Sequence, residues 1–129
     1  MKPINLTISG LHSFRKQQTI DFTQVTDTGI FGIFGPTGSG KSTILDAITL
    51  ALYGEVERSE SNRTGILNQQ ETKIYVKFTF ELHSGTHYDK YSVERSYTKN
   101  KDQRIRTSLA RLIHYENGVE IPIADQEKK

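Results

Sequence analysis

Apolar and polar residues alternate strictly along much of this chain, which is typical of strands with one buried face. Ile4, Leu6 and Ile8 alternate with polar residues, and residues 19–23 predict a second short strand. The alternation returns after residue 72, where strands are predicted over residues 73–82, 91–97, 104–115 and 119–123. Turn signals separate these four segments and predict an antiparallel meander. The inward residues of its first strand are Ile74, Val76, Phe78, Phe80 and Leu82.

Residues 30–54 follow a different pattern. Residues 30–34, IFGIF, are apolar on both faces, which predicts a strand covered on both sides. From Lys41 the apolar positions take helical spacing, and Gly54 ends the predicted helix, Lys41–Tyr53. Residues 55–72 are polar and aperiodic, which predicts a long exposed loop. The predicted fold class is therefore α/β with α+β-like character, mainly an antiparallel meander with a strand before the glycine-rich segment and one long helix.

Composition adds a few limits to this picture. A chain of 129 residues is expected to be one unit, residues 1–129, and its 34% hydrophobic content suits a piece that buries surface against another part. The 17 basic and 15 acidic residues are too balanced to indicate nucleic acid without local clustering. No cysteine is present, which excludes disulfides and thiolate metal sites. No apolar run predicts a signal peptide or a membrane span, so we expect a cytoplasmic protein.

The strongest chemical signal is GPTGSGKS, residues 35–42, which fits the phosphate-loop pattern G-x-x-x-x-G-K-[ST]. It lies between a predicted buried strand and a predicted helix, as such a loop requires. Gly38 and Gly40 allow successive N–H groups to face one phosphate, and Lys41 can reach the β and γ phosphates as the catalytic charge. Ser42 can offer its hydroxyl to Mg²⁺. The predicted ATP-binding residues are Gly35, Pro36, Thr37, Gly38, Ser39, Gly40, Lys41, Ser42 and Thr43.

A hydrolysing site also needs a Walker-B carboxylate and a residue that positions water. No segment after Leu52 reads as about four apolar residues followed by an acid. Either the acids come from an unexpected place, or this chain holds half of a site.

Three segments carry a resemblance to a known family: residues 6–22, 29–55 and 73–99. They resemble the opening of the SbcC family, the ATPase subunits of bacterial DNA-repair nucleases among the SMC-like, ABC-type ATPases. The resemblance runs from Ile4 to about Tyr97, with a looser tail, and the helix segment STILDAITLALYG is its most specific part.

This resemblance implies the N-terminal lobe of a split ATPase head that uses ATP and Mg²⁺. The signature motif and Walker-B acids then lie in a C-terminal lobe beyond a coiled coil. The implied partners are that lobe, a second head in a homodimer, an SbcD-like nuclease subunit and double-stranded DNA, with no membrane. The full-length protein would be an ATPase that controls a nuclease on DNA ends and hairpins, and this chain alone would be nearly inactive.

Two other functions stay open. One is a lobe of a different ABC-type repair or recombination ATPase, similar to RecF. The other is a small P-loop phosphotransferase, which needs an acid near the γ-phosphate and a lid with arginines. Neither feature is found in the sequence.

Weaker signals concern charged residues. Six basic residues gather between positions 95 and 111 with only Asp102 opposing them: Arg95, Lys99, Lys101, Arg104, Arg106 and Arg111. Lys101, Arg104 and Arg106 are the candidate contacts to DNA phosphates, and the alternative is a solvated hairpin. Asp46, one turn after Ser42, is interpreted as a helix-start charge rather than a Mg²⁺ ligand. His83 and His87 flank a predicted turn, which does not favour a metal site.

Overall fold

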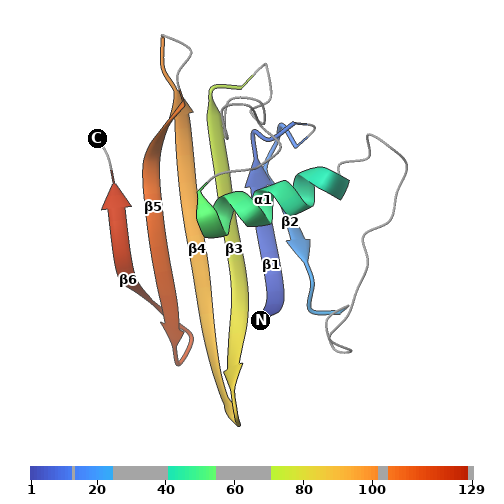
Figure 1. The fold of residues 1–129 in the computed structure, drawn as a ribbon, viewed down its shortest axis with the longest axis vertical. Coiled ribbons are helices and arrows are strands. Elements are labelled where there is room, and N and C mark those ends of the chain that lie inside the picture. The colour runs from blue at the N-terminus through green and yellow to red at the C-terminus, as the bar shows by residue number, and fades with distance from the viewer. Residues whose placement is uncertain (13, 25–40, 55–70, 102–104, 128–129) are drawn as a thin grey trace.

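The described residues of the computed structural model, 1–12, 14–24, 41–54, 71–101 and 105–127, form a six-stranded antiparallel sheet with one helix across one face (Figure 1). The strand order is β2-β1-β3-β4-β5-β6. The elements in chain order are β1 Lys2–Ser9, β2 Gln18–Asp21, α1 Lys41–Tyr53, β3 Lys73–Ser84, β4 His87–Lys99, β5 Ile105–Glu116 and β6 Val119–Glu127.

The predicted antiparallel meander is confirmed, because β3, β4, β5 and β6 pair in sequence order and each pair is antiparallel. The bounds of α1 agree with the predicted helix, Lys41–Tyr53. Calling this helix long was wrong, since 13 residues is close to the average helix length in globular proteins. The predicted strand at residues 30–34 and most of the loop at 55–72 lie outside the described residues.

Glycines and one asparagine end the elements where a positive φ is needed. Gly54, at φ +80°, follows α1 and donates its N–H to Leu50 O at 2.9 Å, which satisfies a carbonyl of the last turn. Asn117 and Gly118, at φ 51° and 79°, form the turn between β5 and β6. Two successive positive φ values suit the right-handed twist of a hairpin, so the predicted ENG turn is confirmed.

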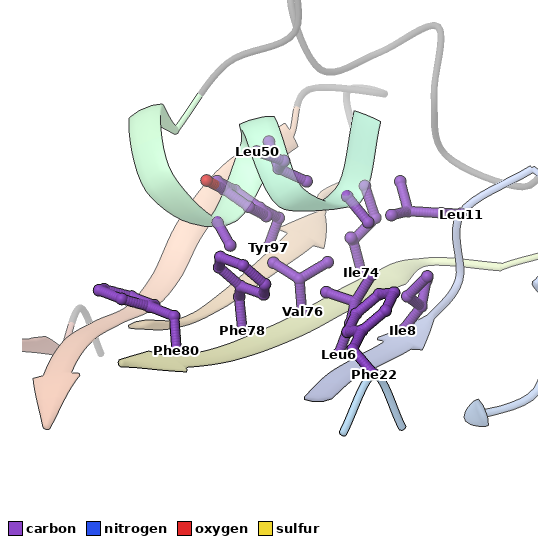
Figure 2. Close-up of a cluster of buried hydrophobic side chains, with 12 residues drawn as sticks. Leu6, Ile8, Leu11, Phe22, Leu50, Ile74, Val76, Phe78, Phe80 and Tyr97 are labelled. Atoms are coloured by element: carbon purple, nitrogen blue, oxygen red, sulfur yellow. The ribbon is translucent and has the colours of Figure 1, made fainter. Parts of the chain in front are cut away.

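The hydrophobic core lies between α1 and the sheet (Figure 2). Leu6, Ile74, Val76 and Phe78 point from the strands toward the helix, and Leu50 points back from it. All five side chains are fully buried. This confirms the predicted alternation of β3 up to Phe80, which is 7% exposed.

The prediction that Leu82 is inward and buried was wrong, because this side chain is 45% exposed. Figure 1 shows α1 crossing one half of the sheet while the β3–β4 hairpin continues past it. Leu82 keeps the alternation of the strand but has passed the part of the sheet that α1 covers.

Candidate nucleotide-binding site

The described part of the phosphate-loop motif is the start of α1. Lys41 is the first residue of the helix, Ser42 is exposed, and Thr43 is 5% exposed. Residues 35–40 and the side chain of Lys41 lie outside what the structure describes. The first turn of α1 carries no acidic residue, so no carboxylate there neutralises the positive end of the helix dipole. An exposed hydroxyl beside the N–H groups of a helix start fits a bound phosphate and its Mg²⁺.

The C-terminal end of α1 is fixed to β4 by Arg95. The Arg95 Nε–H donates to Ala51 O at 2.7 Å. A Cβ at Gly54 would lie 3.3 Å from Arg95 Nη1, so the guanidinium lies against the helix end. A cation there satisfies a last-turn carbonyl and the negative end of the dipole. Grouping Arg95 with a solvent-facing basic cluster was therefore wrong.

The connection between β1 and β2 reaches the other half of α1. His12 Nε2 lies 4.0 Å from Asp46 Oδ2. Asp46 is 6% exposed and lies in the second turn of the helix. Interpreting Asp46 as a helix-start charge was wrong, because the first turn ends before it and its carboxylate is enclosed beside an imidazole.

The remaining basic residues separate into two groups. Lys101 and Arg106 are exposed at the β4–β5 end of the sheet, and Arg106 pairs with Thr98 in the strand ladder. Arg104 lies outside the described residues. Arg111 contacts Glu94 on the neighbouring strand, with Nη1 3.4 Å from Oε1. The sequence showed only Asp102 as an opposing charge, since it could not show that β5 places Arg111 directly opposite Glu94.

The face of the sheet opposite α1, here called the outer face, is held by polar contacts among Tyr75, Thr79, Ser92, Glu94 and Arg111. Tyr75 donates its hydroxyl to Glu94 Oε2. Burial raises the pKa of Tyr75 well above its ordinary value, and the hydrogen bond to Glu94 adds to the effect. Sequence reasoning missed this network, because each partner reads alone as an ordinary outward strand residue.

The histidines and the helix carry two further observations. His83 and His87 lie on opposite strands of the β3–β4 hairpin, near Glu81 and Asp89 at 3.7 and 3.2 Å. Among the residues that the structure describes, no three histidine or carboxylate side chains are grouped so that they could hold a metal ion. The described helix is also too short to cross a membrane.

Comparison with known proteins agrees with this geometry. A family model described as "AAA domain" matches residues 5–128. The chain is 56% identical to the SbcC subunit of nuclease SbcCD from Bacillus subtilis over 88% of its length, and 44% identical to that of Clostridium acetobutylicum over 100%. It is 35% identical to a probable DNA double-strand break repair Rad50 ATPase of Aquifex aeolicus over 98%.

These matches cover 10%, 11% and 12% of the three relatives, so the chain spans about a tenth of their length. The family model covers more than half of the chain, and the matched residues include the glycine-rich motif, α1 and the sheet. The chain therefore belongs to the AAA domain family and is similar to the N-terminal lobe of SbcC.

Proposed function

We propose that this chain is the nucleotide-binding lobe of an SbcC-like ATPase that acts in DNA repair, where it controls a partner nuclease on DNA ends and hairpins. The observation that carries the proposal is the start of α1 at Lys41, directly after the glycine-rich motif and with Ser42 exposed, in a chain of the AAA domain family. The names of the relatives, a nuclease subunit and a double-strand break repair ATPase, support the DNA-repair setting. The expected compartment stays the cytoplasm.

In this proposal the bound nucleotide is ATP with Mg²⁺. The backbone N–H groups of Gly35 and of residues 37–40 face the phosphates, and Lys41 supplies a charge to the terminal two. Ser42 holds Mg²⁺ through its exposed hydroxyl. Thr43 contributes its backbone rather than its hydroxyl, because its side chain is 5% exposed. Mg²⁺, when bound, offsets the negative charge of the phosphates.

The remaining parts of the site are assigned to other sequence. Leu45 and Tyr53, on α1, are 58% and 74% exposed, which leaves apolar surface for the protein's own C-terminal lobe. That lobe would bring the Walker-B acid, and a second head in a homodimer would cover the nucleotide. An SbcD-like nuclease subunit completes the assembly. The chain alone is then expected to hydrolyse ATP at close to the background rate.

Lys41→Ala in the full-length protein tests the nucleotide site. Mg-ATP affinity, measured by titration calorimetry, should fall by at least roughly a hundredfold, because the point charge on the terminal phosphates is lost. Lys73→Ala, which removes an exposed lysine at the start of β3, is the matched control and should bind as the wild type does. Equal affinities of the wild type and Lys41→Ala would exclude the proposed site.

The basic end of the sheet is proposed to contact double-stranded DNA through Lys101, Arg104 and Arg106. Replacing all three by Glu in the intact complex should weaken duplex binding and lower the slope of log K against log salt by about 0.9 per lost phosphate contact. Lys16→Glu, at an exposed lysine between β1 and β2, serves as the control. An unchanged slope would return these residues to an ordinary solvated hairpin.

A further inference from the structure

His12 is held in a backbone conformation that residues with side chains rarely adopt. Its φ is 41°, in the left-handed region, where among residues other than glycine Asn, Asp and His occur most often. Such conformations persist only where the surrounding structure imposes them, and they cluster at ligand-binding positions. The unusual backbone therefore directs attention to what the imidazole contacts.

The loop that carries His12 is rigidly attached to the sheet. Leu11 is fully buried in the core beside α1. Gly10 donates its N–H to Phe14 O at 2.8 Å, and Phe14 donates to Leu11 O at 2.7 Å. A Cβ at Gly10 would lie 2.0 Å from Lys73 O, so the loop approaches β3 as closely as glycine permits. Because Leu11 is anchored, the next residue is presented to α1 in one place.

The imidazole faces a carboxylate inside the nucleotide-binding helix. His12 Nε2 is buried and lies 4.0 Å from Asp46 Oδ2. Asp46 is four residues after Ser42, one helical turn deeper along α1. A negative charge so close to the start of the helix opposes the partial positive charge that favours phosphate there. Its enclosure makes that effect stronger than it would be in water.

We propose that His12 is a positioning residue for nucleotide binding, which offsets the Asp46 charge and keeps that carboxylate directed away from the phosphates. The inference rests on the proposed ATP site at residues 35–42. It identifies the β1–β2 loop as a part of the lobe that tunes phosphate affinity without touching the nucleotide.

The test uses His12→Asn in the full-length protein, since asparagine tolerates the left-handed backbone while removing the imidazole. Mg-ATP affinity, measured by titration calorimetry, should fall by about fivefold or more, as expected for an uncompensated charge within a few ångströms of the site. Adding Asp46→Asn should restore the affinity to within about twofold of the wild type. Asp46→Asn alone should bind at least as tightly as the wild type.

The rescue separates charge compensation from simple support of the fold, because removing the carboxylate cannot repair a loop that has lost its packing. Thermal unfolding of all four proteins is measured in parallel, and the restored affinity should not require restored stability. Wild-type affinity in His12→Asn would overturn the inference, and so would a loss that Asp46→Asn leaves uncorrected. If the wild type fails to bind Mg-ATP, or binds as Lys41→Ala does, the proposed function itself is wrong and this inference falls with it.

Discussion

Phe78 and Thr79, neighbours on β3, show how differently the two faces of one sheet are held. Both are buried, at 0% and 3% exposed. Phe78 points toward α1 and stacks on Phe80, with ring centroids 5.4 Å apart. Thr79 points to the outer face, where its hydroxyl lies 2.6 Å from Ser92 Oγ. One side chain is held by apolar packing and the other by a hydrogen bond across the strands.

The difference assigns separate tasks to the two faces. On the α1 side the apolar cluster fixes the helix that begins at Lys41, so it also fixes the candidate nucleotide site. Its contribution is large, because each buried aromatic or aliphatic side chain contributes about 1.5–3 kcal/mol. On the outer face each polar contact replaces a contact with water, so its net contribution is smaller. There the hydroxyls and charges define the strand register more than they add stability.

Phe78→Ala should give the largest effect on this comparison. Removing a fully buried aromatic ring from the α1 side is expected to lower the free energy of unfolding by about 3–5 kcal/mol. The loss follows from the missing apolar contacts and from the cavity beneath α1. Urea unfolding of the chain, followed by circular dichroism, measures it.

Thr79→Val is the matched control on the opposite face of the same strand. The shape is nearly kept and one hydroxyl is lost, so the cost should be about 1 kcal/mol. Ser92 keeps a second contact, to Tyr115 OH at 3.0 Å. A loss as large as that of Phe78→Ala would contradict the division between the two faces.

The local parts of this fold could be predicted from the sequence. The alternation of β3, the bounds of α1 and the Asn117–Gly118 turn each depend on residues close together in the chain, and each is confirmed. The glycine-rich motif was equally visible, although its loop lies outside the described residues. Leu82 was misjudged because alternation gives the direction of a side chain but not how far the helix reaches over the sheet.

The contacts that hold the candidate site are of another kind. His12 meets Asp46 across 34 positions of sequence, and Arg95 meets Ala51 across 44. No period or motif predicts such pairs, since they exist only once the strands are in register and the helix is docked. Arg95 carries a further lesson: within a run of basic residues, one cation can serve the fold while its neighbours face solvent.

The smallest effect at neutral pH, and the sharpest test of the outer face, is expected from Tyr75→Phe. Tyr75 donates to Glu94, which also contacts Arg111, so losing the hydroxyl should cost about 1 kcal/mol or less at pH 7. At alkaline pH the sign changes. Burial, and then the bond to Glu94, raises the pKa of Tyr75 in the folded chain, while Arg111 opposes this effect only in part. The unfolded chain loses the phenol proton near pH 10, and the folded chain still holds it there. The stabilisation that Tyr75 provides is therefore complete below about pH 10 and declines as the pH rises further. The free energy of unfolding, measured from pH 7 to 11, should fall more steeply in the wild type than in Tyr75→Phe. Tyr88→Phe, at a tyrosine that is 60% exposed, should keep the wild-type slope. Equal slopes in the wild type and Tyr75→Phe would mean that this hydroxyl is not held in its protonated form by the outer face.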